Sequence, residues 1–339
     1  MKKLLVLFTL TALLAGCGGG SDTSVAEVEA NTAVTFNSAA SEGELLEYTL
    51  DIDNLSYTYK ITESQLGLSN DLKTGTLTKN ADGTYTPSTA PDARVILLPN
   101  KMLVGATTVE VNGVEKSTLI AGVPKATQTV SFSDIAQTYN YAGLQCQDSP
   151  TCTTWNAVYG TFNVQNDGSW TECTSSNYTD SISTPSACTG KDIGTVNALE
   201  NGKFQILASD GKDLGTAMYY YSPTGHKIMV VDLKDTSYTG YGRGMLVGVP
   251  QQAIGEPGPE QIGTWHWNST KPSYGTVQVT GGTSVVDEDG NTHTMTFNSP
   301  WKGFFEVSGS SSKFLLADEG VYLAVKPSQS RLYIGAKID

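Results

Sequence analysis

Short stretches in which apolar and polar residues alternate follow one another along most of the chain. In residues 203–206 (Lys-Phe-Gln-Ile) the two apolar side chains fall on one face of an extended segment and the polar ones on the other, as in a half-buried strand. Residues 161–164 and 276–279 alternate in the same way. Asp-Gly and Asn-Gly pairs, which form tight turns, separate these stretches. The pattern predicts an all-β fold of antiparallel hairpins in up-and-down order.

The middle of the chain has enough alternating stretches for eight strands. They are expected near residues 138–144, 157–165, 168–173, 193–199, 202–208, 216–221, 226–233 and 241–249. Eight successive strands can close into a barrel and so remove exposed sheet edges. In this pattern the chain resembles the β-meanders of lipocalins and avidins, and we expect small barrels in tandem. A β-propeller is the alternative, because its four-stranded blades are also up-and-down meanders.

Internal repetition divides the chain into units. The matching segments are 203–211 with 313–320, 221–230 with 325–334 and with 97–104, 159–164 with 274–279, 194–196 with 75–77, and 119–124 with 246–250. The last two segments both end in Gly-Val-Pro and precede short linkers. Repetition of this kind indicates tandem copies of one structural unit. We expect β-meander units at residues 34–127, 128–255 and 256–339.

The N-terminus has the features of an export signal. Lys2 and Lys3 precede an apolar run over residues 4–14, which is too short to span a bilayer as a stable helix. Residues 14–17 (Leu-Ala-Gly-Cys) resemble the lipobox of bacterial lipoprotein precursors. The resemblance implies a signal peptide at residues 1–16, fatty acylation of Cys17 and anchoring in a membrane. Because Gly18 stands where an aspartate retains such proteins in the inner membrane, the outer membrane is expected, with residues 17–33 as a flexible tether.

The expected mature chain is strongly acidic. Removal of the signal leaves 19 of the 21 Lys and Arg residues against 34 Asp and Glu residues. This excess repels nucleic acid and anionic lipid headgroups, so neither is expected as a partner. Attachment to the membrane is expected only through the lipid on Cys17.

Four cysteines besides Cys17 lie in the middle unit. Cys146, Cys152, Cys173 and Cys188 predict two disulfides, because the protein is expected to be exported. Among the three connectivities we favour neighbour pairing, Cys146 with Cys152 and Cys173 with Cys188. A zinc site is the rival interpretation, but no histidine is nearby in the sequence and the CxxC spacing is missing.

No motif of a common enzyme class is present. Gly-x-Ser-x-Gly, HExxH and phosphate-loop patterns are missing, so no catalytic residue, cofactor or metal is assigned. His266 and His293 can meet on one face of the last unit as metal ligands, although two histidines without a fixed spacing fall short of a metal motif. Residues 287–291 (Asp-Glu-Asp-Gly-Asn) have part of a calcium-loop pattern, and a hairpin turn accounts for them better.

Aromatic residues are the remaining candidates for ligand contact. Trp265 and Trp267 share one face of a strand, and Tyr219 and Tyr221 share one face of another. Such side chains stack on sugar rings or apolar ligands at the mouth of a barrel. We therefore expect a non-catalytic outer-membrane lipoprotein that binds a glycan, a small apolar molecule or an envelope protein. An envelope hydrolase without a readable motif and a structural or assembly lipoprotein are the alternatives.

Overall fold

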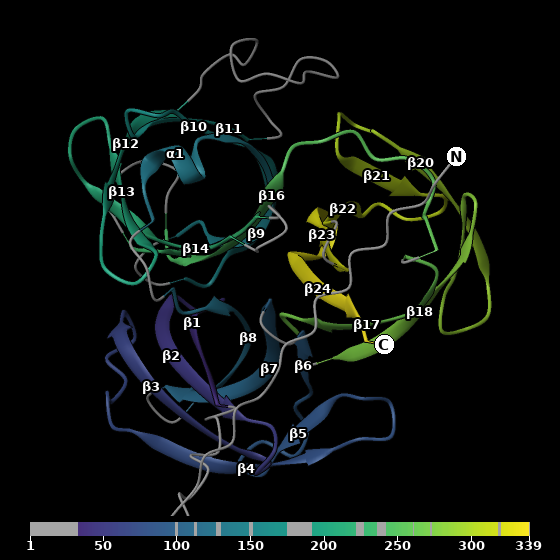
Figure 1. Cartoon of the computed structure of the whole chain (residues 1–339), viewed down its shortest axis with the longest axis horizontal. Coiled ribbons are helices and arrows are strands. Elements are labelled where there is room, and N and C mark those ends of the chain that lie inside the picture. The colour runs from purple at the N-terminus through teal and green to yellow at the C-terminus, as the bar shows by residue number, and fades with distance from the viewer. Residues whose placement is uncertain are drawn as a thin grey trace, which may run out of the picture. The chain divides into compact units, whose positions relative to one another are not determined.

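Each repeated unit closes on itself as a barrel (Figure 1). The computed structural model describes residues 33–98, 101–111, 114–126, 130–148, 152–174, 192–221, 227–235, 242–259, 261–271, 273–317 and 320–338. These residues form three closed barrels of eight antiparallel strands, which confirms the expected all-β fold of tandem small barrels. The propeller alternative is wrong, because the last strand of each unit pairs with the first strand of the same unit.

The strands follow one another around each barrel in chain order. Barrel 1 comprises β1 (Val34–Ala40), β2 (Glu44–Asp51), β3 (Ser56–Ser64), β4 (Lys73–Lys79), β5 (Tyr85–Pro87), β6 (Val95–Leu98), β7 (Met102–Val111) and β8 (Val114–Pro124). Barrel 2 comprises β9 (Gln137–Cys146), β10 (Trp155–Val164), β11 (Ser169–Thr174), β12 (Asp192–Ala198), β13 (Lys203–Ala208), β14 (Asp213–Tyr221), β15 (Lys227–Leu233) and β16 (Gly244–Pro250). Barrel 3 comprises β17 (Gly263–Ser269), β18 (Tyr274–Gly281), β19 (Ser284–Val286), β20 (Thr292–Phe297), β21 (Phe304–Val307), β22 (Lys313–Ala317), β23 (Val321–Lys326) and β24 (Arg331–Lys337).

Helical structure is confined to short segments of the described chain. Helix α1 (Phe132–Ile135) precedes barrel 2, and the 3₁₀ turn η3 (Pro327–Gln329) joins the last two strands. None of the helices in the described ranges has the length and apolar character needed to cross a membrane. The expected signal peptide, Cys17 and residues 18–32 of the expected tether lie outside the described residues.

Turn chemistry accounts for the strand boundaries of barrel 2, whose eight strands all occur where they were expected. Between β10 and β11, Gly168 adopts a φ of +81°, a conformation that a side chain would strain. The preceding Asp167 accepts a hydrogen bond from the Ser169 backbone N–H at 2.9 Å. An Asp-Gly pair therefore both bends the chain and satisfies a turn amide, as the sequence pattern requires.

The repeat alignment is correct for four matches and displaced for two. Residues 159–164 and 274–279 both lie on second strands, 194–196 and 75–77 on fourth strands, and 119–124 and 246–250 on eighth strands. Likewise 221–230 and 97–104 both join a sixth strand to a seventh. However, residues 203–211 begin on the fifth strand of barrel 2, whereas 313–320 begin on the sixth strand of barrel 3, so both matches to barrel 3 in this region are wrong by one strand. Alternating apolar residues look alike on neighbouring strands, which explains the displacement.

One apolar cluster joins the three barrels. Its members come mainly from β7 and β8 of barrel 1, from β9, β15 and β16 of barrel 2, and from β22, β23 and β24 of barrel 3. Strand β16 is buried on both faces: Met245 and Val247 belong to the shared cluster, and Leu246 belongs to the interior of barrel 2. The barrels therefore pack against one another around a shared apolar core and are not independently packed domains.

A buried asparagine on the first strand of each barrel donates a hydrogen bond to the backbone of the next barrel. The Nδ2 atoms of Asn37, Asn140 and Asn268 lie 3.0, 2.8 and 3.0 Å from the carbonyl oxygens of Asn201, Lys302 and Arg94, respectively. Barrel 1 thus contacts barrel 2, barrel 2 contacts barrel 3, and barrel 3 contacts barrel 1. The three equivalent contacts satisfy polar backbone groups at the edge of the shared core.

The predicted pairing of Cys146 with Cys152 is confirmed: the two residues form a disulfide with a Cα–Cα distance of 5.2 Å. Cys173 is also disulfide-bonded. Its expected partner, Cys188, lies outside the described residues. Among those residues, the one cluster with metal-ligand geometry is Cys146, Cys152 and Asp235, and its two thiols are consumed by the disulfide.

Candidate functional site

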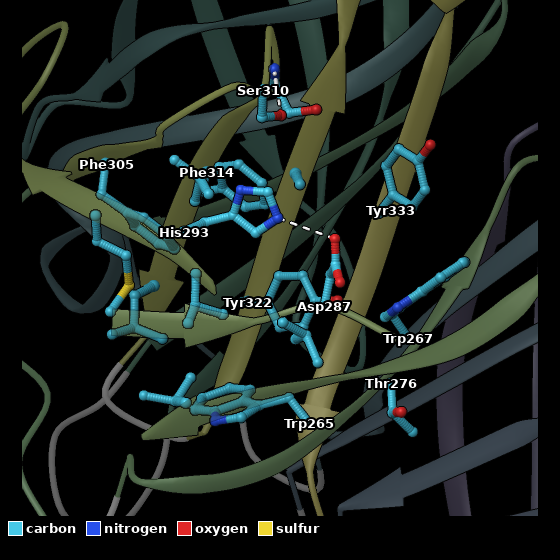
Figure 2. Close-up of a pocket in the computed structure, with 18 of the residues that line it drawn as sticks. Trp265, Trp267, Thr276, Asp287, His293, Phe305, Ser310, Phe314, Tyr322 and Tyr333 are labelled. Carbon is cyan, nitrogen blue, oxygen red and sulfur yellow. Dashed lines mark hydrogen bonds and ion pairs between the residues drawn. The ribbon is translucent and has the colours of Figure 1, made fainter. Parts of the chain in front are cut away.

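Barrel 3 has a cavity of about 430 Å³ that is partly open to solvent. Its wall is mainly apolar, and the aromatic rings in it come from six of the eight strands. Figure 2 shows most of these rings. The aromatic residues labelled there are Trp265, Trp267, Phe305, Phe314, Tyr322 and Tyr333. A concave, mainly apolar site with a few polar groups is the usual form of a small-molecule pocket.

The alternation of β17 places two of these rings in the barrel. Trp265 and Trp267 point inward, whereas Asn268 points outward and reaches barrel 1. Trp265 packs edge-on against Tyr322 with ring centroids 5.7 Å apart, and Trp267 packs edge-on against Tyr333 at 5.4 Å. Trp265 is 1% exposed and its indole N–H donates to the Gln261 carbonyl at 2.9 Å, which fixes that ring as part of the cavity floor.

Two phenylalanines continue the wall on the opposite side of the barrel. Phe305 on β21 and Phe314 on β22 are cross-strand partners, and their rings stack with centroids 5.0 Å apart. Met295 and Val285 extend the same surface and are themselves buried. The result is an apolar surface on which a flat or elongated ligand can lie.

An ion pair between Asp287 and His293 supplies polar groups to the cavity. His293 on β20 has its Nε2 atom 2.9 Å from the Asp287 carboxylate and its Nδ1 atom 3.0 Å from the Ser308 carbonyl (Figure 2). The hydrogen bond to Asp287, followed by the one to Ser308, raises the pKa of His293 above its usual range. Hydrogen bonds from His293 and from the Asn291 backbone lower the pKa of Asp287 to about 2.

The geometry of this pair limits its chemistry. Both ring nitrogens of His293 face acceptors, so the protonated ring can donate a hydrogen bond to each. In that protonation state the ring has no lone pair with which to act as a general base towards a serine or a water molecule. The pair therefore fixes the β19–β20 hairpin and adds a charged group to the cavity.

The acidic segment 287–291 forms the hairpin turn that the sequence analysis favoured over a calcium loop. Gly290 has a φ of +82°, and its N–H donates to the Asp287 carbonyl at 3.0 Å. The Asp287 carboxylate accepts hydrogen bonds from the Asp289 and Asn291 backbones as well as from His293. Its oxygens are occupied by these donors, which is the arrangement of a turn.

The four aromatic residues predicted for ligand contact do not meet. Trp265 and Trp267 line the cavity of barrel 3. Tyr219 lies in the interior of barrel 2, where its ring packs edge-on against Tyr139 with centroids 5.8 Å apart. Tyr221 is 53% exposed at the end of β14. Phe305, Phe314, Tyr322 and Tyr333 were not singled out, although each lies on an alternating stretch whose inward face could have been followed from the sequence.

The two histidines also point to different places. His266 is 9% exposed and faces the Asp82 carboxylate of barrel 1 at 3.9 Å, whereas His293 faces the cavity. Among the described residues, no cluster with metal-ligand geometry includes either of them. The expectation that they could meet on one face is therefore wrong, because they alternate onto opposite sides of the barrel wall.

The barrels differ in how fully their interiors are packed. Barrel 2 retains a space of only about 20 Å³, because Tyr141, Phe162 and Trp170 fill it. Barrel 1 has a cavity of about 300 Å³. Three barrels of the same topology thus have one filled and two hollow interiors, and the hollow of barrel 3 is larger than that of barrel 1.

Comparison with known proteins gives no family. No family model and no curated protein matches the chain. A crystal structure of a protein of unknown function from the DUF3598 family of Nostoc punctiforme PCC 73102 aligns with 10% identity and a TM-score of 0.24, over 64% of this chain and 95% of that chain. Transferrin Binding Protein B of Haemophilus parasuis Hp5, a vaccine antigen, aligns with 11% identity and a TM-score of 0.20, over 90% of this chain and 76% of that one. Scores this low carry no functional argument.

Proposed function

We propose that this protein is a lipid-anchored binding protein of the bacterial outer membrane and that its third barrel binds a small apolar molecule. The observation that carries the binding proposal is the aromatic cavity of about 430 Å³ in barrel 3. This volume falls within the range of roughly 300–1,000 Å³ that is typical of small-molecule sites. Anchoring is proposed from the lipobox-like residues 14–17 and the glycine-rich residues that follow.

The lining favours an apolar molecule over the two other ligand classes considered. A glycan needs many hydrogen-bonding groups along its rings, whereas most of the cavity surface here is apolar, with Trp, Phe, Tyr, Val and Met side chains prominent in the lining. A protein partner needs a broad exposed surface, whereas these rings line a concave cavity. Most of the charged groups, including Asp287 and His293, lie on the β19–β20 hairpin, and Lys326 lies at the end of β23. An apolar ligand with a polar end therefore fits best.

Binding can be tested with the neutral fluorescent probe N-phenyl-1-naphthylamine and the Trp267→Ala variant. Trp267 is partly exposed within the cavity, so truncation removes a contact surface without opening the buried core. Loss of roughly 80 Å² of apolar contact corresponds to about 2 kcal/mol, or an affinity about 30-fold lower. Trp155→Ala is the matched control, because Trp155 is a partly buried tryptophan of barrel 2. Equal losses in both variants, or no binding to the parent protein, would refute the site.

Anchoring can be tested by metabolic labelling with an alkyne analogue of palmitate. The parent protein is expected to incorporate the label and to fractionate with the outer membrane, whereas Cys17→Ala is expected to do neither. Label retained in Cys17→Ala, or an unlabelled parent protein in the soluble fraction, would contradict the anchor and leave the binding proposal unaffected.

A further inference from the structure

A second cavity, of about 300 Å³, lies within barrel 1 and has a different chemistry. Leu46, Tyr48, Tyr59, Ile61 and Ile120 provide its apolar wall. Tyr48 and Tyr59 stack on neighbouring strands with ring centroids 5.3 Å apart and an interplanar angle of 10°. The cavity therefore has the size of a small-molecule site and a continuous aromatic surface on one side.

A buried carboxylate, that of Glu44, is among the groups that line this cavity. Glu44 begins β2, and strand alternation places it on the same inward face as Leu46 and Tyr48. It is 2% exposed. One oxygen, Oε1, accepts a hydrogen bond from the Leu66 backbone N–H at 3.0 Å. The other, Oε2, is buried and has no hydrogen-bond partner among the described residues.

An unsatisfied carboxylate oxygen is costly inside a protein unless a ligand supplies a donor. Burial raises the pKa of Glu44, while hydrogen bonds from the Ser64 side chain and from the Leu66 and Gln65 backbones, together with the charge of Arg243, act in the opposite direction. The vacant hydrogen-bonding capacity is that of Oε2, on a residue that lines the cavity.

The charges around the cavity favour a cation. Glu42 and Glu44 both line it, against one lysine, Lys73, which is exposed. Lys116 lies 3.4 Å from the Glu42 carboxylate and partly offsets that charge. The faces of Tyr48 and Tyr59 add the negative potential of aromatic rings, which attracts a desolvated ammonium group. A neutral alcohol could donate a hydrogen bond to Oε2, but it would not gain the electrostatic attraction that these acidic and aromatic groups exert on a cation.

We propose that the cavity of barrel 1 binds a small primary amine with an apolar body, whose ammonium group donates a hydrogen bond to Glu44 Oε2 while the body packs against Leu46, Tyr48 and Tyr59. This site is independent of the aromatic cavity of barrel 3, since no residue lines both. It takes a cationic ligand, whereas the barrel 3 site takes an apolar one. The feature that distinguishes the barrel 1 site is a buried carboxylate oxygen without a hydrogen-bond partner among the described residues.

The proposal is tested by isothermal titration calorimetry with 2-phenylethylamine and with propylbenzene, in which a methyl group replaces the ammonium. Both ligands are measured in the Trp267→Ala variant, because propylbenzene can also enter the apolar cavity of barrel 3. The amine is expected to bind at least on the order of tenfold more tightly than propylbenzene, because a charge-assisted hydrogen bond distinguishes the two molecules. Equal affinities in this variant, or no amine binding to either the variant or the parent protein, would overturn the proposal.

The variant Glu44→Gln sharpens this test. A glutamine can still accept from the Leu66 N–H, so the fold is expected to persist, while the charge that binds the ammonium is lost. Amine affinity is expected to fall about tenfold or more, to the level of propylbenzene. Glu47→Gln is the matched control, because Glu47 lies on the same strand with its side chain on the outer face and paired with Lys125. Trp267→Ala is also expected to leave amine binding unchanged. Unaltered amine binding in Glu44→Gln, or an equal loss in either control, would refute the assignment.

Discussion

Two of the three asparagines at the barrel contacts, Asn140 and Asn268, allow one hydrogen-bond argument to be tested twice in the same molecule. We predict that Asn140→Ala destabilises the protein far more than Asn268→Ala. Both side chains are 0% exposed and both donate to a backbone carbonyl of another barrel. The two side chains differ in the hydrogen bonds that their Oδ1 atoms accept: Asn140 Oδ1 accepts two, and Asn268 Oδ1 has no donor among the described residues. This difference determines how much each substitution is expected to destabilise the protein.

Asn140 makes three hydrogen bonds. Its Nδ2 donates to the Lys302 carbonyl at 2.8 Å, and its Oδ1 accepts from the Trp301 indole at 3.1 Å and from the Gln251 amide at 3.0 Å. Trp301 is 3% exposed, so water cannot readily replace the lost acceptor. Asn140→Ala removes a hydrogen-bond partner from both the Trp301 indole N–H and the Lys302 carbonyl. A buried polar group that loses its partner costs about 1–3 kcal/mol, so the two losses together are expected to lower the free energy of unfolding by about 4 kcal/mol.

Asn268 makes one hydrogen bond to the Arg94 carbonyl, and its own Oδ1 is already buried without a hydrogen-bond partner among the described residues. The Arg94 carbonyl also accepts from the Ala106 N–H at 3.4 Å, so it keeps a partner when Asn268 is removed. Asn268→Ala therefore loses one hydrogen bond and removes one unsatisfied oxygen. The two effects offset each other, and the net cost is expected to stay under about 1 kcal/mol.

Urea unfolding followed by far-ultraviolet circular dichroism measures both values. The shared apolar cluster predicts one cooperative transition for the three barrels, so the midpoints of the parent and variant proteins can be compared directly at equal slope. If Asn268→Ala costs as much as Asn140→Ala, the asparagines act through the volume they fill and the hydrogen-bond reasoning fails. Separate transitions for the barrels would show that the shared cluster does not couple them.

Two further predictions concern the Asp287–His293 pair and the confirmed disulfide. Because the pKa of His293 is raised, the pair stabilises the fold fully below pH 6.5 and loses this contribution as the pH rises through the raised value. Asp287 contributes fully above pH 3.8 and loses its contribution as the pH falls towards about 2, so stability from this pair is greatest between these limits. Asp287→Asn should lower the pKa of His293 in an NMR titration, and an unchanged value would contradict the pair. Replacing Cys146 and Cys152 by Ala should lower the free energy of unfolding by about 2 kcal/mol, as measured in urea, because the disulfide closes a short loop; no change would mean that the loop is held by other contacts.

Local features of the sequence were sufficient to place the strands of barrel 2. Side-chain alternation and Asp-Gly turns act over a few residues, so pattern reading captures them. The closure of each barrel depends on pairing between strands at opposite ends of a unit, such as β9 with β16, and no local pattern distinguishes that pairing from a propeller blade. The displaced match of residues 313–320 has the same origin, since alternation identifies a strand without giving its place in the sheet.

The sequence contains a pattern from which the shared core could have been predicted. Residues 244–250 (Gly-Met-Leu-Val-Gly-Val-Pro) contain no polar side chain, and an uninterrupted apolar run is typical of a strand buried on both faces. Residues 119–123 have the same character. For the prediction of the three units, these apolar runs count only as matching repeats. Their composition also indicates that the outer face of each of these strands packs against another part of the protein.

The cavity of barrel 3 could not be separated from a filled interior by sequence alone. Trp170 fills barrel 2, where its indole donates to the Leu207 carbonyl at 3.0 Å, whereas Trp265 lines a hollow in barrel 3. Both are large aromatic residues on alternating strands. What differs is the summed volume of side chains that face one another across the barrel, which depends on strand pairings over the whole unit.

The position of each strand relative to the shared core determines where ligand specificity can change. Strand β16 packs against two cores, one on each face, so any substitution there disturbs the barrel and its neighbours together. In barrel 3, Met295 on β20 and Val285 on β19 contact the cavity, while the residues that alternate with them are largely exposed or half-exposed. Substitutions at these two positions alter the cavity with a packing cost confined to one barrel interior. The shared core constrains the outer faces of the central strands and leaves the inward faces of the outlying strands free to differ. This division explains how barrels of one topology can have a filled interior in one unit and hollow interiors with different linings in the other two.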